Sequence, residues 1–397
     1  MEPAVATAAT RMSRGTVLAL VCVSRLVDFT LRMGIVPFFP ELAGRFDISY
    51  AAVGGVYSAF FIGYAALQLP FGWMADRWPE NRLVALGLIG LGASALAFLQ
   101  AETWQGAAAA RVVMGAATAA MAVPGIRLAA TMFPSERRGH AVGMVETAIG
   151  ASNLLALSGY PLLAQWVAVD TLTLVPALAS FPLAAAFWWA GSPPRPDNPA
   201  ADPRGQQARI GDLRQVLALF VLGSLGLMAL NGFMGWAPTY LREGLGYAPS
   251  AAAAVMAVGL AIYVPAAYLA GSASDRLGRR IPVINGGSAL LIAAHLGLGF
   301  GDAGPALVYA GALLFGIGGG SSMPALIAFS TEALGPARAG LAIGLMQVAA
   351  QVGSAAAGVV YGAVVDLTGE FRGVWWLGAS LLAVRILASR LAVEAGK

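Results

Sequence analysis

Three charged residues lie inside the first long apolar segment of the chain, at Arg25, Asp28 and Arg32. Their spacings of three and four residues place them on one face of a helix. If this helix crosses a membrane, each charge near its centre costs about 2.5–3.5 kcal/mol, so the face should look into a polar cavity. One aspartate cannot neutralise two guanidinium groups, and arginine holds carboxylate or phosphate through two parallel hydrogen bonds. The pattern predicts an anion site, with an internal salt-bridge ladder to neighbouring helices as the alternative.

Of the two arginines, we expect Arg32 to be the ligand contact and Arg25 to be the more structural member. Two acids could carry a proton near them. Glu146 lies in the fifth apolar segment, six residues beyond the preceding loop, where a carboxylate that loses its water can take up a proton. Asp28 is the rival protonation site. A salt bridge between Glu146 and an arginine of the fourth segment is the alternative role.

Polar side chains in other apolar segments could complete such a site. Gln347 and Gln351 lie one turn apart on one helical face, as do Tyr64 and Gln68. Amides in membrane helices also serve as hydrogen bonds between helices, so both roles stay open. The complete set of predicted substrate contacts is Arg32, Arg25, Tyr64, Gln68, Asn231, Trp236, Tyr263, Gln347 and Gln351.

The composition shows what kind of element positions these residues. The chain is 58% apolar and 11% charged, with a mean hydropathy of +0.73, whereas soluble domains carry about 25% charged residues. This indicates an integral membrane protein without a separate soluble domain. Cys22 is the single cysteine, which excludes an intrachain disulfide. No phosphate-binding loop, metal motif or dinucleotide fingerprint occurs, so we expect neither an enzyme nor a cofactor nor a metal.

Twelve apolar runs are long enough to cross about 30 Å of hydrocarbon. They fall near 16–40, 50–74, 82–101, 105–132, 140–166, 169–191, 215–241, 249–273, 281–300, 304–330, 338–365 and 372–392. A polar, Pro-rich stretch separates the first six from the last six. The predicted organisation is an all-α membrane protein with a six-helix bundle at 1–192, a linker at 193–214 and a second six-helix bundle at 215–397.

The basic residues of the loops predict the orientation. Sixteen lie on the side of the even-numbered loops and the termini, against three on the other side. We therefore expect a multi-pass protein of the cell inner membrane with both termini and the linker in the cytoplasm. Because these residues occupy short loops between spans, the net charge of +4 does not indicate a nucleic-acid partner. The expected partners are the bilayer, a small-molecule substrate and protons, and we expect a monomer.

A charged hairpin occurs once in each half. The first runs Gly72-Trp-Met-Ala-Asp76-Arg77, and the second runs Gly271-Ser-Ala-Ser-Asp275-Arg276-Leu-Gly-Arg-Arg280. Recurrence at half the chain length, in matching apolar surroundings, suggests duplication of a membrane unit. We interpret Asp76–Arg77 as a gate between the halves and Asp275–Arg276 as a weaker copy of it. Loops that only fix the topology are the alternative.

Six plus six spans, the cytoplasmic linker and the two hairpins together resemble the major facilitator superfamily. A second signature, Arg111-Val-Val-Met-Gly115 with Pro124 further on, lies in the fourth span. The resemblance implies two pseudo-symmetric six-helix bundles, a central site and alternating access, with Arg111 among the gating residues. The first hairpin departs from the family pattern after Arg77, and the Gly-Pro antiporter signature is missing from the fifth span, which counts against drug/proton exchange.

The sequence therefore predicts a secondary active transporter that moves a small organic or inorganic anion with protons. The runner-up is proton-driven efflux of amphipathic, drug-like or lipid-like compounds, because the second half has so few charges in its spans. A membrane sensor or an intramembrane enzyme would need an output domain or a catalytic pair, and the sequence has neither.

Overall fold

The computed structural model describes residues 12–75, 77–133, 135–191, 213–333 and 339–392. The elements of the first half are α1 (Arg14–Met33), η1 (Val36–Phe38), α2 (Phe39–Phe46), α3 (Tyr50–Ala75), α4 (Glu80–Leu99), α5 (Trp104–Thr131), α6 (Ser135–Leu154), η2 (Leu155–Gly159), α7 (Tyr160–Leu163) and α8 (Val169–Ala190). Those of the second half are α9 (Leu213–Thr239), η3 (Tyr240–Gly244), α10 (Pro249–Leu277), α11 (Ile281–Gly299), η4 (Gly301–Ala303), α12 (Pro305–Ala333), α13 (Ala339–Thr368), α14 (Arg372–Ala388) and η6 (Ser389–Leu391).

The described residues contain eleven helices that are long and apolar enough to cross a membrane. The twelfth span is α1, whose 20 residues include the charged Arg25, Asp28 and Arg32. The predicted all-α fold of twelve spans in two bundles is confirmed. The predicted linker at 193–214 falls almost entirely outside the described residues, and α9 begins at Leu213.

Two spans are interrupted where the sequence suggested continuous runs. The first ends at Met33 instead of continuing to residue 40, because Pro37 and Pro40 cannot supply the backbone donors of an α-helix. The chain turns there through η1 into α2. The fifth span changes from α6 to the π-helical turn η2, ahead of Pro161, whose missing donor and ring disturb the preceding turn.

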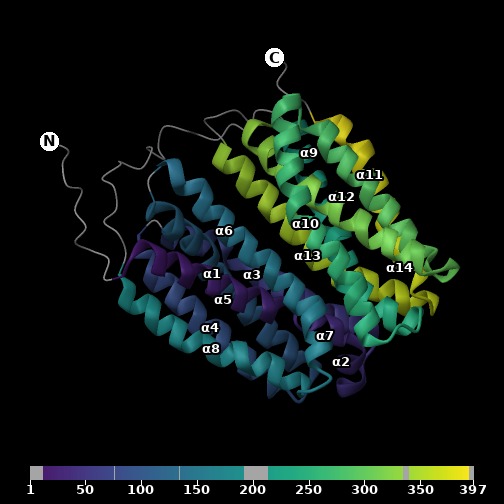
Figure 1. Ribbon diagram of the computed structural model, residues 1–397, viewed down its shortest axis with the longest axis horizontal. Helices are drawn as coiled ribbons and strands as arrows, with labels where there is room; N and C mark the ends of the chain where they lie inside the picture. The colour runs from purple at the N-terminus through teal and green to yellow at the C-terminus, as the bar shows by residue number, and fades with distance from the viewer. Residues whose placement is uncertain (1–11, 76, 134, 192–212, 334–338, 393–397) are drawn as a thin grey trace.

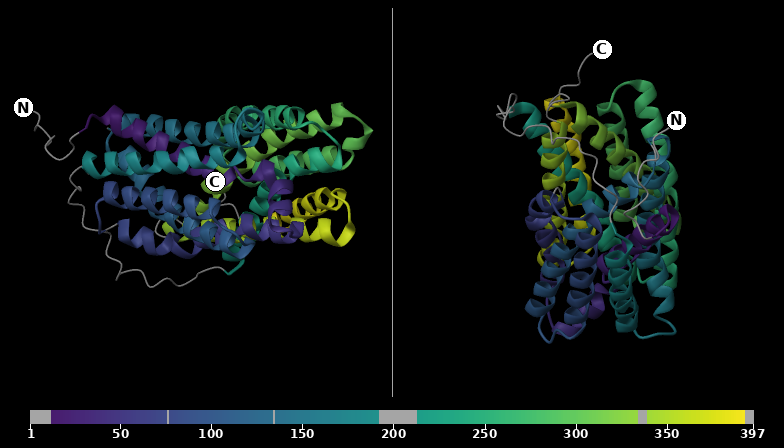
Figure 2. Two further views of the ribbon diagram at one scale, coloured as in Figure 1. Left: turned by 90° about the horizontal axis from the view of Figure 1, so that it is seen from below. Right: turned by 90° about the vertical axis from the view of Figure 1, so that its left-hand side faces the viewer.

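The two halves form separate groups of helices that lie side by side (Figures 1 and 2). Within the first half α3 and α4 pack on α5, and within the second half α10 and α11 pack on α12. Across the halves α3 packs against α13, and α10 packs against α6 and η2. These two pairs of helices border the space between the bundles.

Glycines bring α3 and α13 into backbone contact. A Cβ atom at Gly54 would overlap the carbonyl of Gly358, and one at Gly358 would overlap the carbonyl of Gly54. Small residues at a crossing of membrane helices allow this close approach. The contact therefore depends on both glycines and holds the two halves together along α3 and α13.

Polar contacts seal the halves together at one end, which we call the outer end; it comprises residues 35–51, 236–248 and 366–372. Arg242 donates to Glu41 Oε1 at 2.8 Å and to the Pro37 carbonyl at 2.8 Å. The Asp366 carboxylate accepts the backbone N–H groups of Tyr50 at 3.0 Å and Ala51 at 2.8 Å. It thereby caps the start of α3 from the opposite half.

Candidate functional site

A cavity of about 380 Å³ lies between the two halves. Helices of both bundles supply its walls, as expected for a site at the interface of the two repeats. Five of the predicted site residues line it: Arg32, Glu146, Asn231, Tyr263 and Gln347. They come from α1, α6, α9, α10 and α13, so the fold brings together residues up to 315 positions apart in the sequence.

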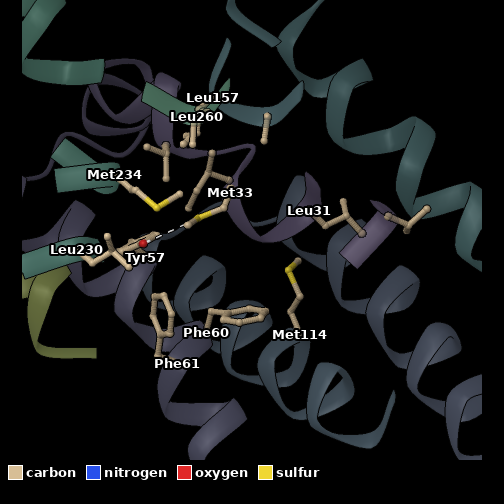
Figure 3. Packing of buried hydrophobic residues seen from close by; sticks show 14 of the residues in the cluster. Leu31, Met33, Tyr57, Phe60, Phe61, Met114, Leu157, Leu230, Met234 and Leu260 are labelled. Carbon is tan, nitrogen blue, oxygen red and sulfur yellow. Dashed lines mark hydrogen bonds between the residues drawn. The ribbon is translucent and has the colours of Figure 1, made fainter. Parts of the chain in front are cut away.

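Arg32 reaches this cavity from the last turn of α1 and is held by aromatic rings. Its guanidinium carbon lies 5.0 Å from the ring centroid of Phe29, 5.1 Å from that of Phe60 and 4.6 Å from that of Phe61. Figure 3 shows Phe60 and Phe61 with Tyr57, whose hydroxyl contacts the sulfur of Met33. A cation over an aromatic ring is stabilised by about 0.5–1 kcal/mol when exposed and by about 2 kcal/mol or more when desolvated, and the contact leaves its N–H donors available.

No carboxylate of the described chain lies within ion-pairing distance of Arg32. Its Nε atom is buried and has no hydrogen-bond partner there. Arg32 is half-buried, and removing a cation from water without an acid beside it is costly. The arrangement leaves the Arg32 guanidinium at the wall of the cavity without an ion-pair partner among the described residues.

Arg25 and Asp28 neutralise each other instead. Arg25 donates to Asp28 Oδ2 at 2.9 Å, and Thr118 on α5 donates to Asp28 Oδ1 at 2.6 Å. Both charged side chains are buried, and neither residue lines the cavity. Of the two roles that the sequence left open, Arg25 and Asp28 form the internal salt bridge, whereas Arg32 faces the cavity.

Arg111 is fully buried and fastens α5 to the end of α1. It donates to the backbone carbonyls of Leu31 at 3.1 Å and Arg32 at 3.0 Å. These carbonyls belong to the last turn of α1, where no intrahelical donor remains for them. Arg111 thus acts on the backbone that carries Arg32, and it does not line the cavity.

Glu146 lines the cavity from α6 with an exposed side chain. Within the described chain it forms no ion pair: Arg127 approaches Glu80 at 3.8 Å, and Arg111 binds carbonyls. The cavity therefore presents one carboxylate and one guanidinium that are not paired with each other. Arg385 in the second half is buried and donates to Leu222, Ser288 and Ser322, so it does not add to this charge.

The other predicted contacts lie apart from the cavity. Trp236 is fully buried at the outer end, with its ring centroid 5.4 Å from that of Phe39. Tyr64 stacks on Phe60. The side-chain carbonyl oxygens of Gln68 and Gln351 are buried without a hydrogen-bond partner among the described residues. The structure does not bring Arg25, Tyr64, Gln68, Trp236 or Gln351 to the cavity wall.

Of the predicted gating residues, Asp76 lies outside the described residues. Its neighbour Arg77 packs on the Trp73 ring at 3.9 Å and donates to the Trp73 carbonyl at 3.2 Å. These local contacts keep Arg77 against its own helix. The gate predicted for the first hairpin therefore stays a prediction.

In the second hairpin Asp275 pairs with Arg280 at 2.6 Å, while Arg276 is exposed. Arg280 also binds Glu332 on α12 at 2.9 Å. The hydrogen bonds that Arg280 donates to Glu332 and Asp275 raise the pKa of Arg280 above its ordinary value. The hairpin therefore joins α10 to α12 within the second half.

Sequence reasoning did not identify Phe29 and Asn153 as wall residues. Phe29 lies four residues after Arg25 and three before Arg32, so helical spacing could have placed it on the same face. Asn153 follows Glu146 by seven residues, two turns along α6. The contribution of Phe60 and Phe61 has no local signal, because these residues reach Arg32 only through the packing of α3 on α5, which brings their rings beside the end of α1.

A twelve-span fold with an unpaired charge in a cavity between two bundles defines a membrane transporter. The family profile described as Major Facilitator Superfamily matches residues 21–357 and 219–395. The chain therefore belongs to the Major Facilitator Superfamily, and it is a transporter rather than an enzyme.

Individual relatives are distant. The chain is 25% identical over 412 residues to "Probable sulfoacetate transporter SauU" of Cupriavidus necator, covering 95% of this chain and 93% of that protein. It is 29% identical over 144 residues to the hexuronate transporter of Escherichia coli, covering 35% of this chain and 32% of the relative. It is 26% identical over 246 residues to protein spinster homolog 1 of Bos taurus, covering 57% of this chain and less than half (45%) of that relative.

Solved structures share the fold over nearly the whole chain. A bacterial homologue of the human lysosomal transporter Spinster, in an inward-facing and unoccupied conformation, aligns with a TM-score of 0.76 at 15% identity and covers 96% of this chain and 98% of that one. The nucleoside transporter NupG aligns with a TM-score of 0.78 at 14% identity and covers 94% and 98%. At this identity the likeness concerns the fold alone.

Proposed function

We propose that the protein is a secondary active transporter that works by alternating access and moves a small anion together with protons. The observation that carries the proposal is Arg32, an arginine without an acidic partner at the wall of a cavity between the halves. A guanidinium can bind a carboxylate, sulfonate or phosphate through parallel hydrogen bonds. The relatives named for sulfoacetate and hexuronate transport carry organic acids in their names, which supports this substrate class.

Charge balance supplies the coupling. With Glu146 ionised and no substrate, the guanidinium of Arg32 and the carboxylate sum to zero. Protonation of Glu146 makes the cavity positive, and a bound monoanion returns the sum to zero. The protein can then pass through the conformation in which the cavity is closed on both sides with no net charge enclosed, both when it is loaded and when it is empty. An unbalanced charge in this low-dielectric interior would be costly. Binding of proton and anion is therefore mutually favourable.

The loops predict how the protein lies in the cell. We propose that both termini lie in the cytoplasm, because the basic residues of the loops gather on that side. We also propose that the protein is a monomer of the cell inner membrane. The outer end, which is sealed by Arg242 and Asp366, then faces away from the cytoplasm. Alternating access requires this seal to open and the opposite ends of the helices to close.

The test is counterflow in liposomes against a panel of carboxylates, sulfonates, phosphate, nitrate and cationic drugs, with and without a pH gradient. We expect anion counterflow in the wild-type protein and its loss in Arg32→Ala. Arg372→Ala is the matched control, because Arg372 is exposed at the outer end and pairs with Asp302. Anion transport that is unchanged in Arg32→Ala would reject the site.

A second candidate is proton-driven efflux of amphipathic or lipid-like compounds. It is favoured by the apolar side chains that α9 and α12 present to the cavity, among them Leu230 and Met323. A counterflow signal restricted to the cationic drugs would support this alternative and overturn the anion assignment.

A further inference from the structure

The number of cationic groups at the cavity limits the charge of its ligand. Arg32 is the one arginine on the wall among the described residues, and Arg25 is neutralised by Asp28. Three aromatic rings contact the guanidinium of Arg32, those of Phe29, Phe60 and Phe61. These contacts leave the N–H groups in the guanidinium plane available to donate to a ligand. One guanidinium with free N–H donors can bind one anionic group of a ligand. Among the described residues the wall has no second cationic group to bind another.

The wall contributed by the second half is mainly apolar and carries no charged side chain among the described residues. Leu227, Leu230 and Met234 line it from α9, and Met323 and Ile327 line it from α12. This wall offers hydrophobic contact and no charge. A charged group placed against it would lose its hydration without gaining a partner, which is strongly unfavourable.

The polar side chains on the same wall have little capacity for a second anionic group. The Asn231 amide nitrogen already donates to the Leu227 carbonyl at 3.2 Å and to Ser354 Oγ at 2.9 Å. Its donors are therefore used within the second half. What remains are neutral groups such as Tyr263 and Gln347, which can bind a hydroxyl or carbonyl of a substrate.

The size of the cavity argues against a small inorganic ion. Its volume of about 380 Å³ lies within the range of about 300–1,000 Å³ that is typical of sites for organic ligands. An ion of four or five atoms bound to Arg32 would leave most of the apolar wall uncovered. An organic substrate would cover this wall and bury its own apolar surface, which is favourable.

We propose that the substrate is an amphipathic organic monoanion, with its carboxylate or sulfonate at Arg32 and an apolar body against α9 and α12. This inference rests on the proposed function and narrows it from anions in general to those with one charge and an apolar body. Met323 and Leu230 would act as specificity-determining residues, because they form the surface that rejects a second charge.

Alkyl sulfonates test the inference, since they remain ionised and do not cross the bilayer as neutral acids. Methanesulfonate, butanesulfonate and hexanesulfonate would be compared by calorimetric binding to the purified full-length protein and by competition in counterflow. We expect affinity to rise roughly threefold to fourfold per methylene group, the amount that corresponds to burial of each CH₂. Hexane-1,6-disulfonate has the same carbon chain and should compete at least tenfold more weakly than hexanesulfonate.

A charge introduced into the apolar wall provides the second arm. Met323→Lys should shift the preference toward hexane-1,6-disulfonate by at least tenfold, whereas Met323→Gln, of similar length and uncharged, should not shift it. If Met323→Lys does not fold, the comparison of the mono- and disulfonate on the wild-type protein decides alone.

The outcomes separate this inference from the proposed function. Equal or better competition by hexane-1,6-disulfonate, sulfate or phosphate, with dependence on Arg32 retained, would overturn the monoanion inference and leave anion transport standing. Absence of any binding or counterflow by anions would overturn both.

Discussion

Arg111 on α5 donates a hydrogen bond of 3.0 Å to the backbone carbonyl of Arg32, the residue that presents the unpaired charge to the cavity. A second bond of 3.1 Å reaches the carbonyl of Leu31. One guanidinium therefore satisfies two carbonyls at the end of α1. The same guanidinium lies 5.2 Å from the Phe60 ring, which also contacts Arg32. The backbone that carries the Arg32 side chain is thus held by a second arginine that does not line the cavity.

Replacement of Arg111 by lysine should weaken anion binding more than turnover. The ammonium group keeps the charge but cannot reach two carbonyls with the planar geometry of a guanidinium. One buried carbonyl is then left unsatisfied, which costs about 1–3 kcal/mol. We expect a lower melting temperature in detergent and a raised KM with a smaller change in kcat, measured by initial rates in liposomes. An unchanged KM would contradict a positioning role for Arg111.

The pair Arg25–Asp28 should behave as a structural unit. Arg25→Met leaves the Asp28 carboxylate buried without its cation, and breaking a buried pair in this way costs about 3–5 kcal/mol. The double variant Arg25→Met with Asp28→Asn removes both charges and should recover much of this loss, because Thr118 can still donate to the amide oxygen of Asn. Free energies of unfolding of the four proteins, measured by denaturant titration in detergent, give the coupling energy.

Anion counterflow by that double variant decides the role of Arg25. Retained counterflow would exclude Arg25 as a required substrate contact and Asp28 as the required proton carrier. Loss of counterflow in a well-folded double variant would return both residues to the site.

The sequence predicted the twelve spans well, because each span must present about 20 apolar residues to lipid and each loop must break that pattern. It also predicted the three charged residues of α1 as one face. It assigned the more structural role to Arg25 and the ligand contact to Arg32, but it could not supply the neighbours that separate the two, which are Thr118 and the Phe60 and Phe61 rings from other helices. Trp236 shows the same limit. Helical periodicity places it on a face, but only the packing of α9 on η1 and of the Trp236 ring on Phe39 shows that this face is closed.

Gly54→Ala should open the outer end. The added Cβ would overlap the carbonyl of Gly358, and overpacking of this kind costs about 1–3 kcal/mol. The strain arises only where α3 and α13 touch, so it disfavours the sealed conformation relative to one in which the halves separate. Gly55→Ala is the matched control, because a Cβ atom there meets nothing within 4 Å.

The measurement is cysteine labelling. With Cys22, the single native cysteine, replaced by serine, a cysteine at Met33 on the cavity wall would be labelled by a membrane-impermeant maleimide in right-side-out vesicles. We expect faster labelling in the Gly54→Ala background and no change with Gly55→Ala. Equal rates in the two backgrounds would show that the glycine contact does not hold the outer end closed.

Glu146→Gln should abolish proton-driven accumulation of the anion and leave anion counterflow intact. The substitution keeps the size and hydrogen-bonding capacity of the side chain but fixes it in a neutral form, which corresponds to the protonated state that favours anion binding. We therefore expect counterflow, which needs only the loaded protein, to persist in liposomes. Accumulation driven by an inward proton gradient should be lost, because a protein that never releases the proton cannot use the gradient.

Glu243→Gln is the control for that experiment, since Glu243 is exposed in η3 at the outer end and does not line the cavity. It should accumulate substrate as the wild-type protein does. If Glu146→Gln still accumulates anion against its gradient in response to pH, proton coupling does not pass through this carboxylate. Glu146 would then keep one protonation state through the cycle, and the empty and the anion-loaded cavity would differ by the charge of the substrate.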